Sequence, residues 1–137
     1  MPTTKEKKAA AIKHILETVF ALDPDSNIHK ALKENDLVSP FDIVSMSDKD
    51  ISLLSFKQGN QATYLSKGHI GKLTAFNAFC MHRQINGTPL GENDWDKITE
   101  DEFNKFRSGP DFKCWQLNGP PAAAKVVDPV RAFKKRI

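Results

Sequence analysis

Long apolar runs are missing from this sequence of 137 residues, and its two cysteines are not clustered. No run approaches the roughly 20 apolar residues that a membrane-spanning helix needs, and residues 1–14 lack the apolar core of a secretory signal. Cys80 and Cys114 stand in an otherwise ordinary composition, so we expect reduced thiols. These absences predict an intracellular protein, cytoplasmic or nuclear, that has no membrane partner.

The net charge of +3 conceals an uneven distribution of charge along the chain. Residues 1–14 carry a net +3 and residues 125–137 a net +4, which leaves −4 for the middle. Basic ends can contact RNA or DNA, but so few charges can also do no more than keep the ends of a chain soluble. Both interpretations stay open on charge alone.

The first helix is predicted by an apolar stripe with helical spacing. Thr3 or Thr4 can cap its start, and Pro24 cannot continue it. We interpret the stripe as an interaction face for another chain, with packing on the protein's own bundle as the alternative. The stripe consists of Ile12, Ile15, Leu16, Val19 and Phe20, at positions i, i+3, i+4, i+7 and i+8.

Further helices are predicted by capping signals and periodicity. Ser39-Pro40 gives an N-cap followed by proline at the first helical position, and Thr99 with Glu102 forms a capping box. A Gly59-Asn60 turn signal lies between two short, partly apolar flanks and predicts either a small hairpin or an irregular loop. The predicted helices span about residues 27–35, 40–45, 48–54, 67–86 and 100–107.

Taken together, the elements predict an all-α fold, a small bundle of short capped helices closed by one long helix. Over residues 26–86 the order of helices resembles a sterile-alpha-motif-like bundle. We predict an N-terminal amphipathic helix over 1–25 and a helical core domain over 26–107. A Pro/Ala-containing linker is expected over 108–127, and the start of a following, truncated helix over 128–137.

The stretch "KGHIGK" combines a Gly-x-x-Gly spacing with Lys67 and Lys72. A phosphate-binding loop of this type needs flanking strands or a second spacing, neither of which is present, so close helix packing at the glycines is the alternative. His69 and Cys80 would lie about 16 Å apart on one helix, too far to share a zinc ion or to act as a nucleophile–base pair. We predict no enzyme activity, no catalytic or metal site and no cofactor.

Four stretches carry a resemblance to a known family: "IHKALKENDLVSPFDIVSMSDKDISLL", "LSKGHIGKLTAFNAFCMHRQINGTPLGENDWDKITEDEFNKFR", the Pro/Ala linker and "DPVRAFKKRI". In this order the chain resembles the N-terminal region of Gag-Pol-type polyproteins of Copia-like LTR retrotransposons of the microalgal type. It has no zinc knuckle, protease motif or reverse-transcriptase motif.

The resemblance implies a non-enzymatic helical module for protein–protein contact, including self-association. The alternative is a small helical domain that binds nucleic acid through basic residues at the start of the long helix and at the C-terminus. The residues in question are Lys67, Lys72, Arg131, Lys134, Lys135 and Arg136.

Overall fold

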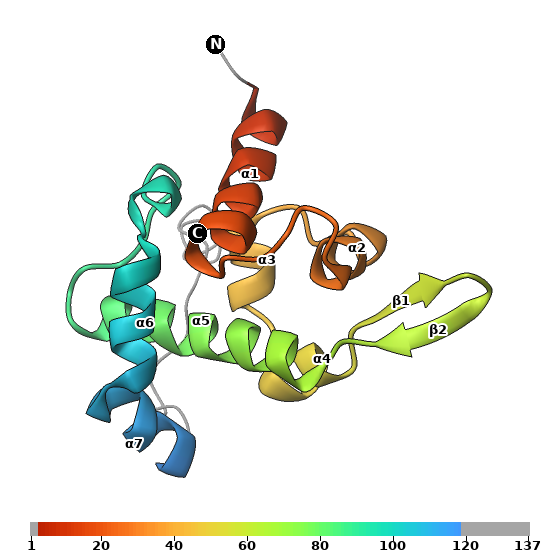
Figure 1. Cartoon of the computed structure of the whole chain (residues 1–137). Coiled ribbons are helices and arrows are strands. Elements are labelled where there is room, and N and C mark those ends of the chain that lie inside the picture. The colour runs from red at the N-terminus through yellow and green to blue at the C-terminus, as the bar shows by residue number, and fades with distance from the viewer. Residues whose placement is uncertain (1–2, 119–137) are drawn as a thin grey trace, which may run out of the picture.

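The computed structural model describes residues 3–118, which form a small, mostly helical bundle with one two-stranded hairpin (Figure 1). The predicted all-α fold is confirmed. None of the described helices is long and apolar enough to cross a membrane. The elements in order are α1 (Thr4–Lys13), η1 (His14–Val19), α2 (Asn27–Glu34), α3 (Pro40–Val44), α4 (Asp48–Ser52), β1 (Ser55–Gln58), β2 (Gln61–Tyr64), α5 (Lys67–Ile85), η2 (Trp95–Lys97), α6 (Glu100–Ser108) and α7 (Pro110–Asn118).

The first predicted helix is present but has two parts. The Thr3 hydroxyl caps α1 by accepting a hydrogen bond from the backbone N–H of Glu6. α1 has no buried residue, whereas the wider π-helical turn η1 is buried along the apolar stripe. Ala21 then takes a left-handed φ of 54°, which ends the helix. α1 therefore projects from the body of the molecule, and η1 is the part that enters it (Figure 1).

The core surrounds α5, which runs through the centre of the bundle. Phe76 on α5 and Phe103 on α6 both contact Phe20, with ring centroids 5.6 Å and 5.2 Å from the Phe20 ring. Trp95 adds a further ring 6.2 Å from Phe76. Aromatic pairs at such separations add to the burial of large apolar surfaces. The core thus joins segments from both ends of the described chain, and the predicted separation of residues 1–25 from the core does not describe this fold.

The short helices follow their capping signals closely. Ser39 and Asp42 form a reciprocal capping box at the start of α3, and Ser47 caps α4 through the N–H of Asp50. Ile28, Ala31 and Leu32 form the buried face of α2. Leu53 is 55% exposed, because α4 ends at Ser52 and the chain turns toward β1.

The C-terminal boundary of the predicted core is wrong. Residues 110–118, placed in the linker, form helix α7 with Pro110 as its first residue, where a missing N–H costs no helical hydrogen bond. Phe112 is buried with its ring 5.6 Å from that of Phe106, and Trp115 also packs on the core. The remainder of the predicted linker and the helix predicted to begin at residue 128 lie outside the described residues.

The Gly59-Asn60 signal produces a hairpin. β1 and β2 pair antiparallel, with Ser55 opposite Tyr64 and Gln58 opposite Gln61. Gly59 has a φ of 67°, and Asn60 has no positive φ, which is the pattern of a type II′ turn with glycine at its first central position. The hairpin extends from the body of the molecule, and α2 lies beside β1 (Figure 1).

Candidate functional site

The two lysines predicted to bind nucleic acid from α5 have different surroundings. Lys67 is exposed in the first turn, whereas the Lys72 ammonium donates a 2.6 Å hydrogen bond to the backbone carbonyl of Phe20. That carbonyl belongs to the end of η1, where a cation is favoured by the helix dipole. Residues five positions apart also point about 140° apart around a helix. The structure therefore does not bring Lys67 and Lys72 together.

Two basic side chains of "KGHIGK" have lowered pKa values. Burial, followed by the nearby Arg107 charge, lowers the pKa of Lys72, and burial with the nearby Lys72 charge lowers the pKa of His69. Both shifts disfavour positive charge at this segment. The predicted alternative of close packing at the glycines is wrong for Gly71, because nothing lies within 4 Å of the place where its Cβ would be. The other predicted basic residues, Arg131, Lys134, Lys135 and Arg136, lie outside the described residues.

The apolar stripe predicted as an interaction face lies in the protein's own core. Ile12 is partly buried against this core, and the other four residues are at most 2% exposed. The interaction-face prediction is wrong because the apolar stripe packs against α5 and α6. These helices present the aromatic rings described above. The buried members are Ile15, Leu16, Val19 and Phe20.

The buried thiol of Cys80 is poorly suited to act as a nucleophile. Cys80 is buried, and burial raises the pKa of its thiol well above the ordinary value, which disfavours the reactive thiolate. Cys114 is exposed on α7 and accepts a 3.4 Å contact from the Asn118 side-chain amide. Within residues 3–118, no three side chains of the His, Cys, Asp and Glu types are grouped so as to hold a metal ion.

A serine, a histidine and a glutamate do lie together at the start of α2. The Ser26 hydroxyl is 2.7 Å from Nδ1 of His29, and Nε2 of His29 is 3.6 Å from the Glu17 carboxylate. The second distance exceeds a hydrogen bond, and Nε2 is buried without a hydrogen-bond partner. An acyl-transfer triad needs its base held by the third group. We therefore assign these side chains to linking η1 with α2.

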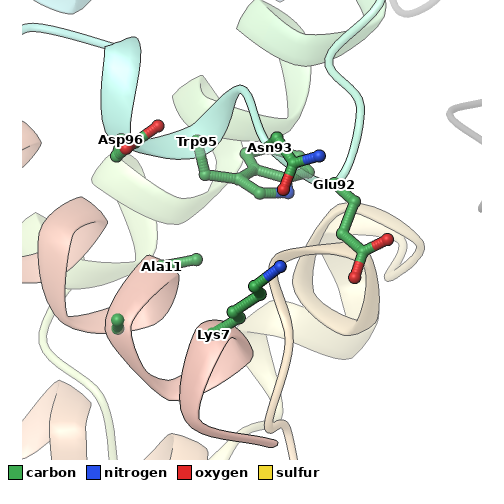
Figure 2. Close-up of a pocket in the computed structure, with 7 residues that line it drawn as sticks. Lys7, Ala11, Glu92, Asn93, Trp95 and Asp96 are labelled. Atoms are coloured by element: carbon green, nitrogen blue, oxygen red, sulfur yellow. The ribbon is translucent and has the colours of Figure 1, made fainter. Parts of the chain in front are cut away.

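A cleft of about 240 Å³ lies between α1 and the segment around η2. Figure 2 shows Lys7 reaching from α1 toward Glu92 and Asn93, with Asp96 at the opposite end. Trp95 is only 2% exposed, so its indole belongs to the core more than to the cleft. The cleft is smaller than the roughly 300 Å³ at which small-molecule sites begin.

The two edges of the hairpin differ in how they are covered. Along β1, the backbone N–H of Lys57 donates to the Glu34 carboxylate at 2.9 Å, and the Asn35 amide donates to the carbonyl of Ser55 at 2.9 Å. Glu34 and Asn35 come from the C-terminal end of α2, which packs beside β1. The outer edge of β1 is therefore closed by side chains of the same molecule.

The outer edge of β2 is open. Because Ser55 and Lys57 direct their backbone groups toward α2, their pairing partners Tyr64 and Ala62 direct theirs away from β1. Across the described residues, no hydrogen bond to these backbone groups occurs. We call the N–H and C=O groups of Ala62 and Tyr64 the open edge of β2.

An exposed aromatic ring lies next to the open edge. The Tyr64 side chain is 63% exposed and belongs to the strand that carries this edge. Tyr64, Ala62, Ser55 and Lys57 share the outer face of the hairpin, since Phe56 on the opposite face is buried. Open backbone groups and an exposed aromatic ring thus occur side by side.

Sequence reasoning identified the hairpin as one of two alternatives but not its open edge. The available signal was weak: "QATY" contains no charge and no proline, the two devices that most often protect an edge strand. Which edge is open depends on the position of α2, which the local sequence does not specify. Neither a known protein family nor a curated protein sequence nor a solved structure matches this chain.

Proposed function

We propose that this chain is a non-enzymatic protein-interaction module that binds its partner along the open edge of β2. The observation that carries the proposal is the asymmetry of the hairpin: one edge is closed by Glu34 and Asn35, and the other offers free backbone groups beside Tyr64. An exposed sheet edge binds an extended segment through main-chain hydrogen bonds, while side-chain contacts such as those of Tyr64 supply specificity.

This proposal does not depend on the resemblance to Gag-Pol-type polyproteins, which stays a prediction. Nucleic-acid binding also stays a prediction, because Lys72 is engaged with Phe20 and the C-terminal basic residues lie outside the described part of the chain. That the chain has no enzyme activity likewise stays a prediction.

Selection of peptides tests the proposal. Extended peptides from a random library are selected for binding to the full chain, and their binding site is mapped by the shifts of backbone amide resonances. We expect the largest shifts at Gln61–Tyr64, because this strand carries the open edge and the exposed Tyr64 ring. Peptides that shift resonances elsewhere would contradict the proposal.

A proline variant sharpens this test. Ala62→Pro removes one N–H of the open edge and leaves the β1–β2 ladder intact, since edge positions whose N–H faces solvent tolerate proline. We expect it to weaken peptide binding by about tenfold or more. Thr4→Pro is the matched control, because Thr4 is the first residue of α1, where proline is tolerated. Equal binding by both variants would reject the open edge.

A further inference from the structure

The open edge of β2 is complementary to itself. We propose that two copies of this chain form a symmetric dimer in which β2 pairs antiparallel with the partner's β2, producing a four-stranded sheet. This inference rests on the proposed function and names the partner as a second copy. It follows from the register, side chains and charge of residues 61–64 rather than from any buried apolar area.

The register of the dimer is set by which backbone groups are free. Ala62 and Tyr64 each have an N–H and a C=O directed outward, while Thr63 directs its groups toward β1. Antiparallel pairing uses all of these groups only when Ala62 lies opposite the partner's Tyr64. Thr63 then lies opposite the partner's Thr63 on the twofold axis, and every outward N–H meets a carbonyl.

The side chains of this register are complementary in size. The Tyr64 ring lies opposite the partner's Ala62, a small residue, and the same contact repeats across the axis. Cross-strand neighbours of this kind lie close enough for an aromatic ring to cover the smaller side chain. At the centre, Thr63 meets the partner's Thr63, a pair that sheets accept readily. A twofold interface requires this sort of self-complementarity.

Charge and accessibility agree with a second copy as the occupant. All four residues of β2 are uncharged, so two strands approach without like-charge repulsion. Lys57, which carries the only charge in the β1–β2 ladder, lies on the far strand. Helix α2 lies on the β1 side of the hairpin (Figure 1), which leaves β2 on the side away from α2. An interface formed by one short strand from each copy is small, so the dimer forms in a concentration-dependent manner.

Sedimentation of the full chain over a wide range of concentration measures the dimer. We expect the apparent mass to rise from 15.3 kDa toward twice that value. By symmetry, Ala62→Pro removes two of the interchain hydrogen bonds, one from each copy, and we expect it to weaken the dimer by about tenfold or more. Ile85→Lys is a matched surface control, since Ile85 is 53% exposed at the other end of α5. A dimer that survives Ala62→Pro but not Ile85→Lys would overturn the inference.

Disulfide trapping tests the register. In a Cys114→Ser background, Thr63→Cys places two thiols opposite each other at the axis, where the Cα separation of about 4.5 Å in such a pair permits a disulfide. We expect mild oxidation with oxidised glutathione to give a covalent dimer. Gln61→Cys is the control, because in this register the two Gln61 positions are separated by about 13 Å along the strand. Equal trapping of both variants would overturn the register.

The two experiments separate failure of the dimer from failure of the proposed function. A chain that stays monomeric at every concentration but binds extended peptides at the open edge disproves the second copy as partner and keeps the interaction module. A chain that neither dimerises nor binds peptides at β2 disproves both. Dimerisation that Ala62→Pro abolishes, together with trapping at Thr63→Cys, supports both.

Discussion

At the scale of single residues, the start of α5 shows how burial limits what a basic segment can do. The Lys72 ammonium is committed to the Phe20 carbonyl. His69, one turn earlier, has a buried Nδ1 without a hydrogen-bond partner. Burial and the Lys72 charge lower the pKa of His69 from its ordinary value of 6.5. The Lys72 ammonium therefore contributes to the packing of α5 on η1.

The lowered pKa of His69 predicts a pH dependence of stability. The unfolded chain takes up a proton on His69 at higher pH than the folded chain does, so the free energy of unfolding falls as the pH drops below 6.5 toward the folded pKa. We expect His69→Gln to reduce this acid-induced loss of stability. Urea unfolding at about pH 7.5 and about pH 5 measures it. An identical loss in both proteins would show that His69 does not contribute.

At the scale of elements, α3 is held against α5 through backbone groups. The buried Asn77 side chain on α5 donates to the carbonyls of Ile43 at 3.3 Å and Met46 at 3.1 Å, at the C-terminal end of α3. A helix of only five residues leaves most of its carbonyls without an intrahelical partner. The Asn77 amide donates to backbone carbonyls at the end of this short helix. This role explains why a polar residue stands on the apolar face of α5.

Replacement of Asn77 tests this link. Asn77→Ala leaves the Met46 carbonyl without its donor, while the Ile43 carbonyl still accepts from the Met46 N–H, and we expect a loss of about 1–2 kcal/mol in the free energy of unfolding. Asn104→Ala, at an exposed position of α6, is the matched control, with an expected change of about 0.5 kcal/mol or less. Chemical denaturation measures both. A loss at Asn77 no larger than the control would show that α3 stands without this bond.

At the scale of the whole molecule, one core joins the first and last described helices. Phe20 from the N-terminal segment contacts both Phe76 and Phe103, and Phe112 of α7 extends the aromatic cluster through Phe106. Domain boundaries fall where few contacts cross, and none of these junctions meets that description. The described chain is therefore one folding unit, which carries the hairpin as its only sheet within residues 3–118.

Truncation tests this unity. Deleting residues 1–25 removes four buried apolar side chains from the core, each contributing about 1.5–3 kcal/mol. Their sum is comparable with the whole stability of a small domain, about 5–15 kcal/mol, so we expect an unfolded product. Deleting residues 1–8 removes only exposed parts of α1 and should leave cooperative unfolding intact. Circular dichroism during thermal unfolding distinguishes them, and a folded 26–137 fragment would contradict the single core.

Local signals in the sequence determined the helices and most of their ends. Ser39, Ser47, Ser66 and Thr99 each cap the helix that the sequence predicts, because a cap depends only on residues three positions away. The Gly59-Asn60 signal placed the hairpin turn for the same reason. The all-α class followed from these elements together with the helical spacing of apolar residues.

Only the tertiary structure decided which surfaces are buried within the molecule and which stay exposed. The stripe from Ile12 to Phe20 fits a partner or its own bundle equally well as a pattern, and only the position of α5 and α6 assigns it to the core. α7 is stabilised as a helix because Phe112 and Trp115 pack on the core. The open edge of β2 exists because α2 lies along β1 instead. Such outcomes depend on contacts between residues far apart in the chain, which periodicity and capping do not encode.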